Sequence, residues 1–404
     1  MIRETQLRRR AALVCFSVFV CVGGGDALAQ PSLAQRALAK YFHGQPDSAF
    51  VLFKSAVRER PHDAALLGWL AETAVRSGNI SAADSAAEEA LRIDSCNAHA
   101  HLVRAYLFMP RFAGSPGEVN DDSVWAHVTQ AVKCDSTDGN AWTYVWKYAL
   151  MRQDTAAESR SLRGLIESGF LTPSQLTYGE WVLQSLPLNA VLVTAGDLDT
   201  YTPLAIQVAR HMRRDVAVIS ATMLSAAWYT HPVLARHHLN YHWAKADILS
   251  SNESQRILEW LRQQAVGRGA ARPVAFALTV SVDTTVAANG LQLAGPYWLV
   301  VPSKGATIDF SRVKASLSSA EKLDWRGEGI SPDDRSPIHG LAERYPSLMV
   351  ARLLELANGL KARRNPDMER RQQAWLKQFL ARASIDSAII DQTMAKYRNY
   401  PKRN

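Results

Sequence analysis

Cysteine is scarce in this chain, and long apolar runs are scarcer. Only four of 404 residues are cysteine, and two of these, Cys15 and Cys21, lie in an apolar N-terminal segment. The remaining pair, Cys96 and Cys134, belongs to no CxxC pattern and has no metal-ligand spacing, which argues against a cysteine-based zinc site. In an oxidising compartment these two cysteines either form a disulfide or stay free, and the sequence leaves both alternatives open.

The one long apolar run, residues 11–22, follows the basic residues Arg8, Arg9 and Arg10. It is shorter than the roughly 20 apolar residues that a spanning helix needs. Residues 27–29 read Ala-Leu-Ala, the small-x-small pattern of signal-peptidase sites. We therefore predict a signal peptide at residues 1–29, a mature chain that begins at Gln30, and a periplasmic or secreted protein. An uncleaved membrane anchor is the alternative, and no later segment reads as a membrane span.

Several sequence signatures of common function classes are absent. There is no Walker loop, no GxGxxG pattern and no nucleophile elbow. The formal net charge of +8 is spread along the chain and forms no basic stripe with interleaved aromatic residues, so we expect no nucleic-acid partner. The length exceeds what one ordinary core organises, which predicts two or three domains.

The first half of the chain is rich in alanine and has helical spacing over residues 33–169. In the clearest unit, residues 64–95, Gly78 and Asn79 form a turn between two helical segments. Small and apolar side chains recur on one face of each segment: Leu67, Leu70, Ala71, Ala74, Ala83, Ala87 and Ala90. The period of about 34 residues resembles a tetratricopeptide repeat. Stacked repeats leave a concave groove, which we expect to bind a protein or peptide; the alternative is a packing platform for the rest of the chain.

Strand and helix patterns alternate in the second half. Apolar, β-branched runs predict strands at residues 190–194, 216–220, 274–280 and 297–302, with helical segments that include 204–212 and 253–266. This alternation predicts a three-layer, Rossmann-like α/β domain with a mostly parallel sheet. We divide the chain into signal peptide (1–29), tetratricopeptide-like α-solenoid (30–184), α/β domain (185–330) and C-terminal helices (331–404).

Motifs of this α/β segment resemble a known family. The matching residues are Gly196, Asp197, Asp199, Thr200, Arg214, Asp215, Val216, Trp228 and Tyr229. In this order they resemble the soluble C-terminal domain of the protein O-mannosyltransferase-like membrane family. Leu198 replaces the usual Asn, and the membrane-embedded half of that family is missing. The resemblance therefore implies an extracytoplasmic accessory domain and does not imply transferase activity.

The motif Gly196–Thr200 is the candidate site. Asp197 and Asp199 follow a predicted strand, where open α/β sheets bind ligands. Their carboxylates could hold a divalent cation, Mg²⁺ or Mn²⁺, and through it a nucleotide sugar or glycan. Trp228 and Tyr229 could stack on a sugar ring, and Asp283 could form a second wall of the same cleft.

A structural role is the alternative for each of these residues. Asp199, Thr200 or Thr202 could cap the following helix, with Pro203 in its first turn, and the aromatic pair could pack against the sheet. Because no catalytic constellation is complete, we predict an exported, non-catalytic binding or scaffold protein that needs no cofactor. An accessory or enzymatic component of extracytoplasmic glycosylation is the alternative.

Overall fold

The structure is a computed structural model that describes residues 31–109, 119–242, 251–266, 272–280, 290–302 and 306–320. The predicted signal peptide, Asp283 and the predicted C-terminal helices of residues 331–404 lie outside the described residues. Among the described helices, none is both long and apolar enough to cross a membrane.

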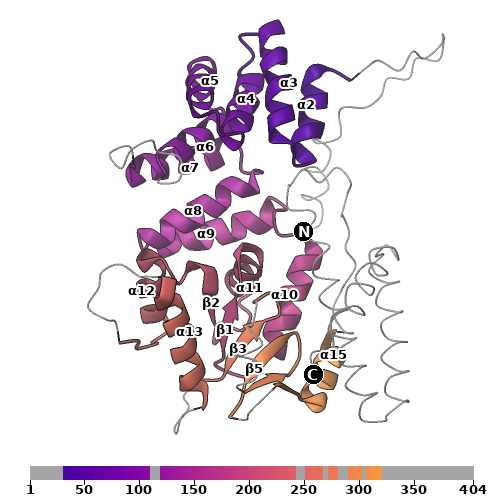
Figure 1. Cartoon of the computed structure of the whole chain (residues 1–404), viewed down its shortest axis with the longest axis vertical. Helices are drawn as coiled ribbons and strands as arrows, with labels where there is room; N and C mark the ends of the chain where they lie inside the picture. Colours follow the sequence, from indigo (N-terminus) through magenta and orange to yellow (C-terminus); the bar gives the residue numbers. More distant parts are fainter. Residues whose placement is uncertain are drawn as a thin grey trace, which may run out of the picture.

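The first part of the described chain is built from helices that pack in sequential pairs (Figure 1). These helices are α2 (Leu33–Phe42), α3 (Pro46–Glu59), α4 (Ala64–Arg76), α5 (Ile80–Ile93), α6 (Ala98–Leu107), α7 (Asp121–Cys134), α8 (Gly139–Met151), α9 (Thr155–Glu167) and α10 (Pro173–Ser185). Polar side chains begin the first helix of each pair. Asp63, Asn97 and Asp138 each accept a hydrogen bond from a backbone N–H in the first turn of α4, α6 and α8.

The unit predicted at residues 64–95 forms the helix pair α4 and α5. Ala71, Ala83, Ala87 and Ala90 have no exposed surface, because they lie where neighbouring helices approach closely. Gly78 makes the turn between the helices with φ +74°, a conformation that favours glycine. The predicted tetratricopeptide-like packing of this unit is therefore present.

A disulfide joins Cys96, just after α5, to Cys134 at the end of α7. Their Cα atoms are 5.3 Å apart, within the range that a disulfide spans. The bond ties together two helix ends that lie 38 residues apart in the sequence. It settles the alternative that the sequence left open.

The second part is a small mixed sheet with helices. Its strands are β1 (Val191–Thr194), β2 (Ala217–Ser220), β3 (Val274–Ala277), β4 (Leu291–Leu293), β5 (Tyr297–Val300) and β6 (Ala306–Ile308), in the order β2-β1-β3-β5-β4-β6. β1 pairs in parallel with β2 and β3, and β4 with β6, whereas β5 is antiparallel to both β3 and β4. The sheet is therefore mixed: three of these five pairings are parallel, as predicted, and β5 alone among the described strands runs in the opposite direction, because the three residues between β4 and β5 allow only a hairpin.

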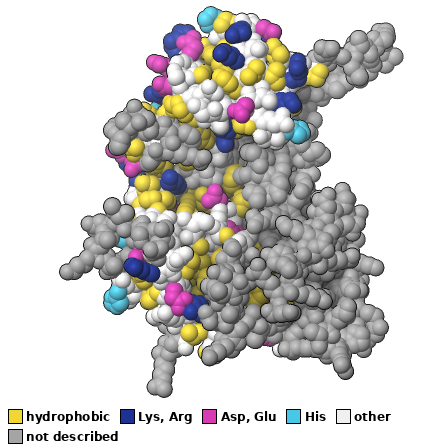
Figure 2. Space-filling view, viewed as in Figure 1, with side chains coloured by type: hydrophobic (Ala, Val, Ile, Leu, Met, Phe, Trp, Pro, Cys, Tyr) yellow, Lys and Arg dark blue, Asp and Glu magenta, His cyan; other side chains and the backbone are white. Residues whose placement is uncertain are grey.

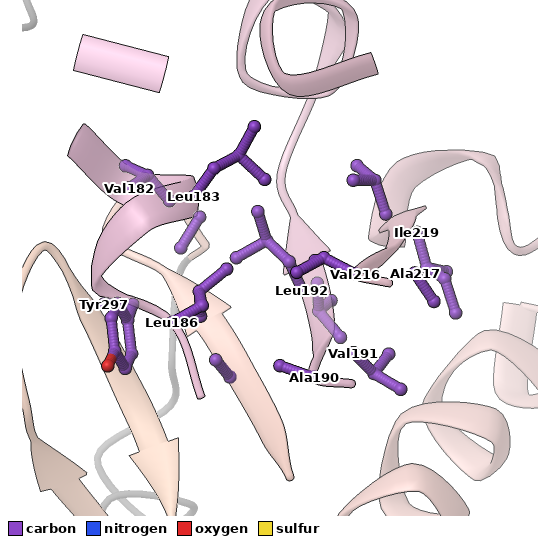
Figure 3. Packing of buried hydrophobic residues seen from close by; sticks show 14 of the residues in the cluster. Val182, Leu183, Leu186, Ala190, Val191, Leu192, Val216, Ala217, Ile219 and Tyr297 are labelled. Atoms are coloured by element: carbon purple, nitrogen blue, oxygen red, sulfur yellow. The ribbon is translucent and has the colours of Figure 1, made fainter. Parts of the chain in front are cut away.

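Helices lie on both sides of the sheet in Figure 1. They are α10 and α15 (Phe310–Ala320) on one side, and α12 (Ala227–Arg236) and α13 (Ser251–Val266) on the other, with α11 (Asp197–Ala209) connecting β1 to β2. Figure 3 shows Val182, Leu183 and Leu186 on one side of Leu192 in β1, and Ala217 and Ile219 of β2 on its other side.

One hydrophobic core runs from α8 to α15 and includes Trp146, Leu165, Leu192 and Val313. It therefore crosses residue 185, where we placed the start of the α/β domain. Helices α8 and α9 form a helix pair inside the segment 30–184 that we assigned to the repeats, and we call this pair the last repeat; it shares this core with the sheet. Where an independently folding unit begins stays a prediction.

Candidate functional site

The motif Gly196–Thr200 forms the start of α11. Gly196 precedes the helix, and Asp197 and Asp199 lie in its first turn. We predicted a helix that begins near Leu204 with Pro203 in its first turn; this was wrong, because α11 begins at Asp197 and Pro203 lies inside it. The carboxylates therefore stand at a helix N-terminus, where negative charge is favourable.

Asp199 is hydrogen-bonded through both of its carboxylate oxygens. Oδ2 accepts a hydrogen bond from the backbone N–H of Ala195 and Oδ1 one from that of Gly196, each at 2.8 Å. The hydroxyl of Thr279 donates a further hydrogen bond to Oδ2. These bonds support the capping role that the sequence offered as the alternative.

Thr279 is a site residue that we did not single out from the sequence. It follows β3, which pairs in parallel with β1, so the ends of the two strands lie side by side. The signal was present: a polar residue after a buried strand next to the strand that carries the motif. We selected Asp283 for the same reason, four residues further along and outside the described residues.

Asp197 differs from Asp199. Its side chain is exposed. Partial desolvation, and then the negative charge of Asp199, raise the pKa of Asp197 above its usual value. Its carboxylate is therefore the one in this motif that faces solvent and has no capping role.

Thr200 has no exposed surface. Its hydroxyl lies 2.6 Å from the Thr194 hydroxyl and donates to the Gly196 carbonyl at 2.6 Å. These contacts hold the start of α11 against the end of β1. Thr200 thus positions the motif in this structure and does not face a cleft.

The cavity beside Asp199 is small. It has a volume of about 20 Å³ and lies between α10, α11, β1 and the end of β3, lined by Tyr178, Gly179, Thr202 and Thr279 among others. This is room for about one water molecule. No group of three or more His, Cys, Asp or Glu side chains in the described part of the chain is placed to hold a metal ion.

Trp228 and Tyr229 lie apart from this cavity. Tyr229 is buried, its hydroxyl accepts a hydrogen bond from the Ser220 N–H at 2.7 Å, and burial raises its pKa. Trp228 is partly buried and lies under the Lys147 ammonium group, 5.6 Å from its ring centroid. The aromatic pair therefore joins α12 to β2 and α8, as the packing alternative expected. The structure does not bring the pair and Asp199 into one cavity.

The first helices of the repeats carry a row of equivalent residues. Tyr41, Glu72, Tyr106 and Lys147 each stand nine residues after the N-cap of α2, α4, α6 and α8. We call this row, together with the neighbouring side chains of Trp69, Arg76 and His99, the repeat face. It is polar and aromatic, although most of it is buried or half-buried.

Glu72 is the centre of the repeat face. Its Oε1 accepts hydrogen bonds from the Tyr41 hydroxyl at 3.0 Å and from Arg76 Nε at 2.5 Å. Its Oε2 is buried and has no hydrogen-bond partner among the described residues. Trp69 of α4 and His99 of α6 have ring centroids 4.0 Å apart, and both remain partly exposed. The arrangement offers an aromatic and charged surface.

Two family models match parts of the chain. A tetratricopeptide repeat model matches residues 43–107, and the model of TMEM260-associated domain 2 matches residues 176–240. No curated protein matches the chain. The first match agrees with the helix pairs, and proteins with such repeats generally bind protein partners. The second covers α10, β1, α11, β2 and α12, which include the Gly196–Thr200 motif.

Proposed function

We propose that this chain is an exported, non-catalytic scaffold protein that binds a protein or peptide partner through the repeat face. The match of residues 43–107 to the tetratricopeptide repeat carries this proposal. Partner binding uses three side chains near Glu72, namely the exposed Arg76 and the partly exposed Trp69 and His99. On the face of the molecule visible in Figure 2, Lys and Arg side chains are scattered among acidic and hydrophobic ones.

The test is affinity capture with the full chain from an extract of the host's exported proteins. Arg76→Ala and Trp69→Ala alter the repeat face, and Arg92→Ala on α5 is the matched control because Arg92 is exposed and pairs only with Glu89 among the described residues. We expect one partner that the parent chain and Arg92→Ala retain and that the repeat-face variants lose. Equal recovery by all four proteins contradicts the proposal.

Export rests on the predicted signal peptide at residues 1–29, and the Cys96–Cys134 disulfide supports it because such bonds persist in oxidising compartments. Mass spectrometry of the protein from its host tests this part. We expect a mature chain that begins at Gln30. A protein with an intact N-terminus in the cytoplasm contradicts the proposal of export. We also propose the finer description of the fold, in which a helical solenoid is followed by a three-layer α/β domain.

A second candidate function is an accessory role in extracytoplasmic glycosylation. It rests on the resemblance of the Gly196–Thr200 motif to the soluble domain of the protein O-mannosyltransferase-like family, and the match of residues 176–240 to TMEM260-associated domain 2 is compatible with it. In this function, Asp197 and Asp199 would bind a divalent cation and a nucleotide sugar or glycan, at the cost of the capping bonds of Asp199. The test is thermal denaturation with Mn²⁺ and nucleotide sugars. A rise in Tm that Asp197→Asn abolishes supports this function, and no rise with any of these ligands counts against it.

A further inference from the structure

A second, larger cavity lies where the last repeat meets the sheet. It has a volume of about 310 Å³ and is bounded by α8 and α9 on one side and by α11, β2 and α12 on the other. Figure 1 shows α8 and α9 lying across the end of the sheet domain that carries α11 and α12. Pockets that bind small molecules often lie at such junctions and begin at about 300 Å³.

Most of the lining is apolar. Leu204 and Val208 contribute from α11, Val216 and Val218 from β2 and the residue before it, and Leu162 from α9. Val208 and Leu204 are only partly buried, although they pack against the main core. The apolar part of a ligand in this cavity would therefore cover apolar side-chain surface that otherwise contacts water.

The charged side chains that line the cavity have a net positive charge. Glu158, whose side chain is 7 % exposed, forms a two-pronged ion pair with Arg236, with both N–O distances 2.8 Å. This pair is therefore internally neutral. Burial, followed by the charges of Arg272, Arg236 and His238, lowers the pKa of His237 to about 4, so this ring is neutral at pH 7.

After the Glu158–Arg236 ion pair is set aside, Arg214 is the remaining cation among the lining residues. Its Nε donates to the Gln207 carbonyl at 3.2 Å, and its Nη2 contacts the His211 ring. Within the described residues, no carboxylate forms a salt bridge with Arg214, although its side chain is exposed at the cavity. A guanidinium with free donors at the edge of an apolar cavity is suited to a carboxylate or phosphate.

From this geometry we propose that the cavity between α8–α9 and α11–α12 binds a small amphipathic anion. The apolar body lies against Leu162 of α9 and against Leu204 and Val208 of α11, and the carboxylate or phosphate pairs with Arg214. The ligand contacts both the last repeat and the sheet domain, so it stabilises their junction. This site is separate from both the repeat face and the Gly196–Thr200 motif, and it does not depend on the function proposed for either.

The test is isothermal titration calorimetry on the full chain with octanoate, octyl phosphate and, as the neutral analogue, 1-octanol. We expect at least one anion to bind more tightly than 1-octanol. Arg214→Gln removes the charge and should weaken binding of that anion by about tenfold or more, since bonds to charged groups are the strong ones. Comparison of the two anions tells carboxylate from phosphate ligands.

Two further variants keep the result interpretable. Val208→Phe fills the cavity from a partly buried position and should reduce binding of all three compounds. Arg163→Gln, an exposed arginine on α9 that does not line the cavity, should bind like the parent chain. Absence of binding by both anions at millimolar concentration overturns the proposal, as do equal affinities of Arg214→Gln and Arg163→Gln.

Discussion

Replacement of Asp199 by alanine should destabilise the fold, whereas the same change at Asp197 should not. Asp199→Ala leaves the N–H groups of Ala195 and Gly196 and the Thr279 hydroxyl without their acceptor. Loss of a helix cap costs about 0.5–2 kcal/mol, and a single hydrogen bond to a charged group about 1.5–3 kcal/mol. Because Ala195 and Gly196 are only half-buried, water replaces part of the loss. We therefore expect a decrease of about 2–3 kcal/mol in the free energy of unfolding.

Asp197→Ala is the matched control, two residues away in the same helical turn. The Asp197 side chain is exposed, and its raised pKa means that its ionisation opposes folding. The alanine variant is relieved of the desolvation of this carboxylate and of its repulsion with Asp199, but it also loses a favourable interaction with the helix dipole, so the free energy of unfolding should change by no more than about 0.5 kcal/mol at pH 7. At a pH at which both carboxyl groups are protonated, the repulsion between them is absent. The stability of Asp197→Ala relative to the parent chain should therefore be lower than at pH 7.

The assay is urea unfolding followed by circular dichroism, with equal m-values as the condition for comparison. An Asp199→Ala protein as stable as the parent chain would refute the capping argument. So would an equal loss for both variants, because the structure assigns the backbone bonds to Asp199 alone in this pair. A ligand role without a capping role would then be the better account of the motif.

Three other changes have defined outcomes. Replacing Cys96 and Cys134 by serine opens a link across 38 residues and should lower the free energy of unfolding by up to about 4 kcal/mol; reduction of the parent chain should lower it equally, and an unchanged urea midpoint contradicts this. Arg213 holds the pKa of Asp215 at about 2, so the stability that this pair contributes is present above pH 4 and is lost as the pH falls towards 2; in an acid titration, Asp215→Asn should flatten that loss. Gly179→Ala places a Cβ 2.6 Å from the Thr202 methyl group between α10 and α11 and should cost about 1–3 kcal/mol despite the better helix propensity of alanine; a rise in Tm contradicts the close packing.

The helix pairs were predictable because their signals are local. Small and apolar residues at helical spacing and a glycine turn lie within a few residues of each other, and they led to the α4–α5 unit correctly. The strands at residues 190–194 and 216–220 were also found, since a buried strand reads as a short apolar, β-branched run. β4 and β6, with three residues each, are too short to give such a signal.

The site was predicted less well, because its roles depend on residues far apart in the chain. The sequence places Asp199 after a strand, but it does not show that Thr279, 80 residues away, donates to it. Nor does it show that Trp228 lies under Lys147 of α8. Asp197 and Asp199 look alike in the sequence, and only the direction of each side chain separates an exposed carboxylate from a capping one.

By itself, the sequence determined the two kinds of architecture and their order, helical repeats first and a strand-containing segment second, because periodicity and turn chemistry are written into neighbouring residues. The tertiary structure alone decided how these parts meet. It joined Cys96 to Cys134, made the sheet mixed, placed α8 and α9 in the same core as β1, and left Arg214 without a carboxylate partner among the described residues at the edge of a cavity. The physical reason is that these properties depend on which surfaces come together in space, and the spacing of residues along the chain does not contain that information.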